Sequence, residues 1–222
     1  MQSRQTLPGR QTAAYRILEF VALSGEFPTD RLSRLPGGEA YKAHVIQSLK
    51  QKHLLRTFYK DGLRGYRLTA KAKGLLTADR PERFLPYLAG AAETNHIKSE
   101  PARRQRLHRI AETAATMQNA GAAIFPDEKP EVFSPAWDGR PQIFITAPAF
   151  YNSREIKELG IEAVKIKGAR SAGVLLTESA VFVIYNLGGS LMKWQYRAEM
   201  RTKALMQTIL CRECLPEQYK PE

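Results

Sequence analysis

Apolar side chains near the start of the chain recur every three to four residues. Tyr15, Leu18 and Val21 are spaced in this way, and the helix that they predict is opened by Thr12 or Gln11 and ends at Gly25. A threonine side chain accepts hydrogen bonds from the free N–H groups at a helix start, and glycine adopts the left-handed backbone at a helix end. We therefore expect an amphipathic helix between these two residues.

Two more helices are expected before residue 53. A short helix covers Thr29–Leu35, with Thr29 as its cap, and a turn rich in glycine follows at residues 36–38. The longer helix covers Glu39–Lys52. Together the three segments predict a helix-turn-helix.

The helix over Glu39–Lys52 has an apolar face and a polar face. If Val45 lies at the centre of the buried face, Tyr41 and Leu49 lie beside it and Lys42 lies on the flank. The side chains that then point away from the core are Glu39, Ala43, Gln47 and Lys50.

The pattern then changes from helical to alternating. Residues 54–59 and 66–69 are typical of two strands, and the pair Asp61-Gly62 between them is a hairpin turn signal. The basic residues Lys60 and Arg64 lie at or near this turn, and Arg67 lies on the returning strand. Thr69 then caps a short helix that contains a glycine.

The order of helix, strand, turn and strand over residues 12–78 resembles winged-helix DNA-binding domains. The resemblance implies that Lys42, Gln47 and Lys50 meet the major groove, while Lys60, Arg64 and Arg67 meet the phosphate backbone from the hairpin. A glutamine amide presents a donor and an acceptor side by side, as a base edge requires. The alternative is an amphipathic surface helix beside a solvated basic hairpin.

Charge is distributed unevenly along the chain. The whole chain carries +12, and residues 1–80 hold 15 lysines and arginines against 6 acidic residues, a net charge of +9. Residues 81–222 hold 19 against 16, a net charge of +3. A concentrated positive field attracts phosphate polyanions, and its coincidence with the winged-helix pattern favours double-stranded DNA as the partner of the first region. The charge alone is weak support for nucleic acid, and the alternative is a solvated basic surface that binds nothing in particular.

The remaining chain predicts an α+β protein. We expect a winged-helix domain over residues 1–80, a helical connector over 81–122 and a small mixed α/β domain over 123–222. The connector contains a short helix over 82–89 and the long helix Pro101–Asn119. We interpret the arginines of the long helix as a solvated face. The elements expected in the last domain are strands at 142–147, 162–167, 173–177 and 181–185, a short helix over 152–159 in which Glu155 caps Asn152, and a closing helix from about residue 192 to Cys211.

A mixed sheet after a DNA-binding region is similar to the restriction-endonuclease-like fold. Nucleases of that kind hold Mg²⁺ with carboxylates and place a lysine two residues from an acidic residue on the same strand face. The candidates here are Glu112, Asp127, Glu162, Lys165 and Lys167, but Glu162 is three residues from Lys165 and five from Lys167, so each pair points to opposite faces. We therefore predict no catalytic and no metal residues.

Lys165, Lys167 and Arg170 have a simpler interpretation. Val164 and Ile166 point inward, so the two lysines share the outer face of the strand. With Arg170 they are candidates for a second set of phosphate contacts, or for an ordinary solvated strand face.

Other classes of function find little support. The pair Cys211 and Cys214 has zinc-ligand spacing without a second Cys or His pair, and no phosphate-binding loop or dinucleotide fingerprint is present, so no cofactor is expected. No apolar stretch has the length of a membrane span and the N-terminus lacks a signal-peptide core, so we expect no membrane partner and a cytoplasmic protein.

Several motifs in order resemble the replication–relaxation type of protein carried by plasmids and conjugative elements. They are YRLTAKAKGLL, RLHRIAETAATMQNAG, FYNSREIK, IKGARSAGVLL, VFVIYNLG and MKWQYRAEMR. The resemblance implies an N-terminal winged helix and a C-terminal nuclease-like domain without a clear active site. It predicts a non-catalytic DNA-binding accessory protein in the replication or mobilisation of such an element, or in its control, with a homodimer or other proteins of the element as further partners. A winged-helix regulator with a sensing or dimerising C-terminal domain, and a metal-dependent nuclease, remain the alternatives.

Overall fold

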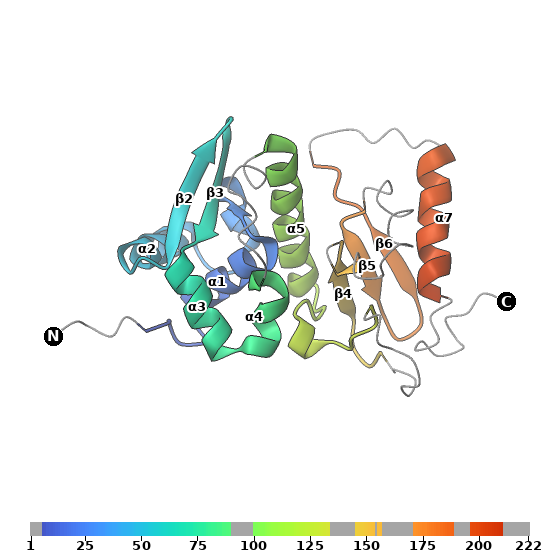
Figure 1. The fold of residues 1–222 in the computed structure, drawn as a ribbon, viewed down its shortest axis with the longest axis horizontal. Coiled ribbons are helices and arrows are strands. Elements are labelled where there is room, and N and C mark those ends of the chain that lie inside the picture. Colours follow the sequence, from blue (N-terminus) through green and yellow to red (C-terminus); the bar gives the residue numbers. More distant parts are fainter. Residues whose placement is uncertain are drawn as a thin grey trace. The chain divides into compact units, whose positions relative to one another are not determined.

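The computed structural model is an α+β protein in two compact units, Met1–Thr116 and Met117–Glu222 (Figure 1). The structure describes residues 6–89, 100–133, 145–153, 155–156, 171–188 and 196–210. No helix in this described part is long and apolar enough to cross a membrane. The long helix expected in a connector belongs to the first unit up to Thr116.

Unit 1 consists of helices around a small antiparallel sheet. In chain order its elements are α1 (Ala13–Ser24), β1 (Phe27–Pro28), the 3-10 helix η1 (Thr29–Arg34), α2 (Glu39–Gln51), β2 (Leu55–Lys60), β3 (Leu63–Leu68), α3 (Ala70–Asp79), α4 (Pro81–Leu88) and α5 (Pro101–Asn119). The strand order is β1-β3-β2, and the hairpin of β2 and β3 projects beyond α1, α2 and α3 (Figure 1).

The local signals at the ends of α1 and α3 are confirmed. The Thr12 side chain accepts from the Tyr15 N–H, and the Thr69 side chain accepts from the Ala72 N–H. Gly25 ends α1 in the left-handed conformation, with φ 82°. These caps satisfy backbone groups that would otherwise lack partners at the helix ends.

The core of unit 1 is formed by α1, which is buried along most of its length. Leu18 and Ala22 are fully buried, and the Phe20 ring lies 6.1 Å from the Phe27 ring of β1. Tyr15 packs edge-on against Phe84 of α4 at 6.4 Å. A buried ion pair between Glu19 and Arg83, 2.6 Å long, also joins α1 to α4.

The second helix differs from its prediction. Thr29–Arg34 forms a 3-10 helix rather than an α-helix, and no side chain caps it. The Thr29 hydroxyl instead donates to the Arg64 carbonyl of β3 at 3.4 Å. Six residues make fewer than two α-helical turns, and the 3-10 form is common in such short connections.

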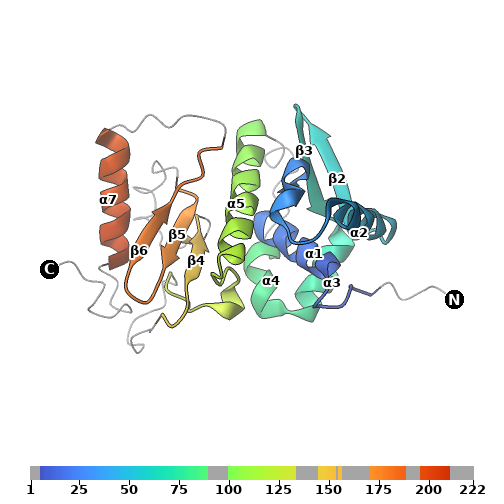
Figure 2. The same cartoon turned by 180° about the vertical axis from the view of Figure 1, so that it is seen from behind.

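Unit 2 contains a second antiparallel sheet of order β4-β5-β6, with β4 at Ala149–Asn152, β5 at Gly173–Leu176 and β6 at Val181–Ile184. Helix α7 (Tyr196–Leu210) packs against β6, as Figure 2 shows from behind. The core between them includes Tyr151, Val174, Leu176, Leu205 and Ile209. The strands expected at 173–177 and 181–185 are confirmed, and so is the closing helix over its described residues.

One predicted strand of unit 2 is wrong in position. Residues 145–147 of the strand expected at 142–147 are not in a strand, and the strand lies at Ala149–Asn152 instead. All four residues of β4 are buried, so this strand lacks the alternation that would have marked it. Residues 142–144 and 162–167, and most of the helix expected at 152–159, lie outside the described residues; the Asn152 N–H does donate to the Glu155 carboxylate at 2.8 Å, as the predicted cap requires.

Candidate nucleic-acid interface

Helix α2 is rotated relative to its predicted orientation. Its buried side chains are Lys42, Val45, Ile46 and Leu49, while Tyr41 is 54% exposed. The placement of Tyr41 in the core and of Lys42 on the flank was therefore wrong. The four buried positions have ordinary helical spacing, and a lysine can occupy one of them because its stem is apolar.

Lys42 is bound inside unit 1. The side chain is buried, and its ammonium group donates to the Leu35 carbonyl at 3.1 Å, immediately after η1. This hydrogen bond compensates the ammonium group for the water it has lost. Lys42 thus joins α2 to η1 and does not belong to an exposed basic surface.

The outer face of α2 agrees with its prediction. Glu39, Ala43 and Gln47 are exposed, and Lys50 is half-buried. The Lys50 ammonium lies 5.4 Å from the centre of the Tyr66 ring on β3, within the range of a cation–π contact. Lys50 therefore connects the outer face of α2 with one face of the hairpin.

The hairpin is closed by a two-residue turn. Asp61 and Gly62 both have positive φ angles, 52° and 74°, and Lys60 pairs with Leu63 across the turn. Positive φ at both central residues defines a type I′ turn, whose twist matches that of paired strands. The predicted hairpin is confirmed, together with its turn.

The register assigns the hairpin side chains to two faces. Cross-strand partners share a face, and side chains alternate along each strand. Arg56 with Arg67, Phe58 with Gly65 and Lys60 with Leu63 make the first face, and Leu55 with Leu68, Thr57 with Tyr66 and Tyr59 with Arg64 make the second. We call them the latch face and the open face.

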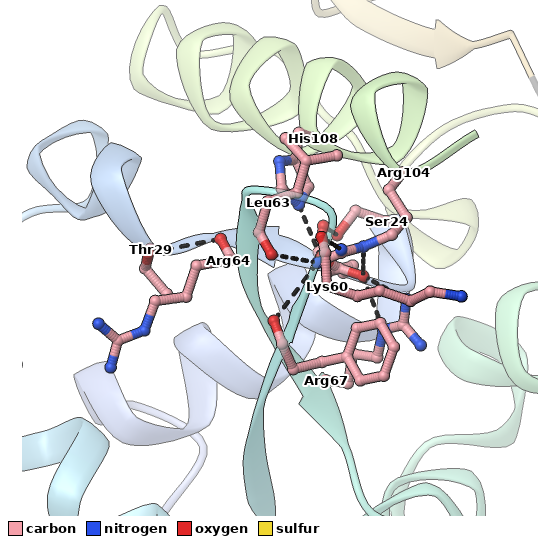
Figure 3. Close-up of polar contacts among 10 residues, drawn as sticks. Ser24, Thr29, Lys60, Leu63, Arg64, Arg67, Arg104 and His108 are labelled. Carbon is pink, nitrogen blue, oxygen red and sulfur yellow. Dashed lines mark hydrogen bonds and ion pairs between the residues drawn. The ribbon is translucent and has the colours of Figure 1, made fainter. Parts of the chain in front are cut away.

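The latch face is held by a buried cluster of charges around Glu26, and Figure 3 shows the three side chains that bind it, Arg67, Arg104 and His108. Glu26 is fully buried, and its carboxylate accepts from Arg67 at 2.6 Å, from Arg104 of α5 at 2.6 Å and from the His108 ring at 2.8 Å. Both guanidinium groups lie over the Phe58 ring, at 3.7 Å for Arg67 and 4.7 Å for Arg104. Arg67 was predicted to contact DNA, but its guanidinium is already paired with a buried carboxylate.

Arg104 also binds the backbone at the end of the hairpin. Its guanidinium donates to the carbonyls of Phe58 at 3.3 Å, Lys60 at 2.6 Å and Leu63 at 3.0 Å. An arginine can do this because its planar fork carries five N–H donors. The side chain is fully buried, so the interpretation of the α5 arginines as a solvated face was wrong for this residue.

The cluster lowers the pKa of Glu26 and restricts which residue can stand at position 65. Burial alone would raise the pKa of Glu26, but the hydrogen bonds from His108, Arg104 and Arg67 outweigh it and lower the pKa to about 2. The carboxylate lies so close to β3 that a Cβ atom at position 65 would be 2.2 Å from its oxygen. Position 65 therefore requires glycine.

The open face carries exposed residues at the tip of the hairpin. Tyr59 is 71% exposed, and its cross-strand partner Arg64 is exposed as well. In Figure 3 the Arg64 side chain points away from the Glu26 cluster. Lys60 belongs to the latch face, but it is also exposed because it lies beside the turn.

The predicted DNA contacts thus separate into three groups. Gln47, Lys50, Lys60 and Arg64 lie on the surface of α2 and the hairpin, whereas Lys42 and Arg67 are engaged inside unit 1. Lys165, Lys167 and Arg170 lie outside the described residues. The sequence reasoning missed Tyr59, although an aromatic residue two positions before Asp61-Gly62 was a visible signal.

The carboxylates considered for a nuclease do not gather in the described part of the chain. Glu112 of α5 lies 3.5 Å from both Arg31 and Arg34, and Asp127 lies in the 3-10 helix η3 (Pro126–Glu128) of unit 2. Among the described residues, no group of three or more His, Cys, Asp or Glu side chains could hold a metal ion. Glu162, Lys165 and Lys167 lie outside them.

Unit 2 contains a buried lysine, Lys129, whose ammonium group is bound by other groups of the same unit. The Lys129 ammonium lies 2.7 Å from the Glu155 carboxylate and donates to the carbonyls of Ile124 at 3.0 Å and Phe150 at 2.6 Å. Burial lowers the pKa of Lys129, although Glu155 opposes the shift. These contacts join the segment before β4 to the residues that follow it.

Comparison with known proteins gives no match to this chain, either among protein-family models, among curated proteins or among solved structures. The resemblance to replication–relaxation-type proteins therefore stays a prediction.

Proposed function

We propose that unit 1 is a winged helix that binds double-stranded DNA, with α2 in the major groove and the β2–β3 hairpin as the wing. The observation that carries this proposal is that some cations around the hairpin are paired with a buried carboxylate while others are exposed. Arg67 of the latch face and Arg104 of α5 are paired with Glu26, whereas Arg64 of the open face and Lys60 at the tip of the latch face are exposed. Lys50 extends the open face toward α2.

Each exposed group has a defined part in this proposal. Gln47 stands on the outer face of α2 beside the small Ala43, which lets the helix backbone approach base edges closely. Lys50, Lys60 and Arg64 contact phosphates on either side of the groove and fix the position of the helix. The contacts require no chemistry at the DNA, so the proposed function is binding without catalysis.

The biological setting rests on the sequence resemblance alone. It makes the protein an accessory factor in the replication or mobilisation of a plasmid or conjugative element, or in its control. Double-stranded DNA is the proposed partner in each of these roles.

The test is DNA binding by a variant that lacks two cations at the hairpin tip. In Lys60→Ala with Arg64→Ala, we expect weaker binding to all duplex sequences by about the same factor, because phosphate contacts carry no sequence information. The matched control is Arg201→Ala with Lys203→Ala, which removes two exposed cations from α7 in unit 2. Fluorescence anisotropy with several unrelated duplexes decides the outcome, and equal affinities for both double variants would refute the proposed surface.

A further inference from the structure

The open face changes in character along the hairpin. Leu55 and Leu68 at its base are buried, Thr57 and Tyr66 in the middle are half-buried, and Tyr59 and Arg64 at the tip are exposed. The last pair therefore presents an aromatic ring and a guanidinium group side by side to solvent.

The tip is held in a defined conformation. The type I′ turn fixes the chain at Asp61 and Gly62, and Arg104 binds three carbonyls of the two strands beside it. Tyr59 is thus displayed from a backbone that is already ordered. A group presented in this way loses little conformational freedom when it binds.

An exposed aromatic ring next to cations suits one feature of nucleic acids in particular. Proteins that bind single strands stack bases on aromatic side chains and hold the adjacent phosphates with basic ones. In a continuous duplex both faces of every base are covered by neighbouring pairs. An unpaired base offers a free face to a tyrosine.

We propose that Tyr59 stacks on an unpaired base, so that the protein prefers duplexes that contain unpaired bases over fully paired ones. The inference rests on the proposed function, since α2 must hold the flanking duplex. Arg64 then contacts the phosphate next to the stacked base, and Lys50 and Gln47 remain on the paired part. An acidic protein surface would be attracted by the same cations, but its carboxylates offer no flat ring that could stack on Tyr59.

The experiment uses the full chain and three DNA probes of one sequence. The first is a fully paired duplex, the second contains a short bubble of unpaired bases, and the third contains a bubble of abasic sites. The abasic bubble is as flexible as the second probe but has no bases to stack. Affinities are measured for the unchanged chain and for Tyr59→Ala, Tyr59→Leu and Tyr59→Phe, with Tyr196→Ala, a tyrosine 75% exposed in unit 2, as the control.

We expect the unchanged chain to bind the bubble with bases more tightly than either other probe. Tyr59→Ala and Tyr59→Leu should lose about five- to tenfold on this probe, the lower end of what stacking of one base contributes, and less than about twofold on the other two. Tyr59→Phe and Tyr196→Ala should keep the preference. Because Tyr59 is exposed, all variants are expected to fold.

Two results would overturn the inference. Equal binding of the two bubbles by the unchanged chain would show that flexibility, not stacking, determines the affinity, and a preference retained by Tyr59→Ala would show that another residue provides it. If duplex binding persists and depends on Arg64 while either result is found, only this inference fails. If no probe is bound, the proposed function fails with it.

Discussion

Two arginines on opposite faces of the β2–β3 hairpin, Arg67 and Arg64, have opposite roles. On the latch face, Arg67 binds the buried Glu26 carboxylate, which Arg104 of α5 binds as well. On the open face, Arg64 extends into solvent next to an exposed tyrosine. Only two residues lie between Arg64 and Arg67 in β3, so the alternation of the strand places them on opposite faces, and Arg67 is the one that faces the Glu26 cluster.

The same contrast occurs on α2, where Lys42 is buried against a carbonyl and Lys50 lies at the surface. A positive net charge therefore overstates the basic surface of unit 1, because some cations balance buried acceptors. What distinguishes a binding surface is the set of cations that the fold leaves accessible.

The largest effect is expected on the latch face, from Arg104→Ala. The change leaves the Glu26 carboxylate with fewer partners and removes the donor from three carbonyls, so we expect a loss of about 3–5 kcal/mol in the free energy of unfolding of unit 1. Urea unfolding followed by circular dichroism measures the loss, and hydrogen exchange of the β2 and β3 amides locates it. Arg106→Ala, an exposed arginine of the same helix, is the control and should change stability by less than about 0.5 kcal/mol. Similar losses in both variants would contradict the stabilising role assigned to Arg104.

Acid should lower the stability of unit 1 by protonating the Glu26 carboxylate. Its pKa is lowered from 4.5 to about 2 in the folded chain, so its contribution is complete above the unfolded value and is lost as the pH falls through the folded value. The shift corresponds to about 3 kcal/mol at neutral pH. We expect the free energy of unfolding to fall more steeply between about pH 5 and pH 2 in the unchanged chain than in Glu26→Gln. Parallel pH curves would show that Glu26 is not the group responsible.

Smaller changes in stability, of opposite sign, are expected when two glycines of unit 1 are replaced by alanine. Gly65→Ala would place a Cβ 2.2 Å from the Glu26 carboxylate and should destabilise the chain by about 1–3 kcal/mol. Gly74→Ala, in α3 with no atom within 4 Å of the new Cβ, should stabilise it by about 0.5–1 kcal/mol because alanine favours the helix. Thermal unfolding of both variants checks the opposite signs. A tolerated Gly65→Ala would mean that Glu26 does not press against β3.

Features set by neighbouring residues could be predicted from the sequence. Thr12 and Gly25 bound α1, and Asp61-Gly62 closes the hairpin, because caps and tight turns depend on a few adjacent backbone groups. The exposed positions of Gln47 and Arg64 followed from helical spacing and from the turn.

Features set by residues far apart in the sequence could not be predicted in this way. Arg104 is buried because Glu26 and the hairpin carbonyls, more than forty residues away, meet it there. Lys42 is buried because its face of α2 is turned toward the Leu35 carbonyl. Strand β4 is buried at all four residues, so it lacks the alternation of a half-exposed strand. In each case, tertiary contacts override what the residue type suggests on its own.

The central claim is that the accessible cations of α2 and the hairpin bind DNA phosphates. The most direct test is the slope of log K against log salt concentration for a paired duplex. In Lys50→Gln with Arg64→Gln, we predict a slope smaller in magnitude by about 2, since each lost phosphate contact removes roughly 0.9. Arg201→Gln with Lys203→Gln should leave it unchanged. An equal slope in the unchanged chain and in Lys50→Gln with Arg64→Gln, or binding that does not depend on salt, would contradict the claim.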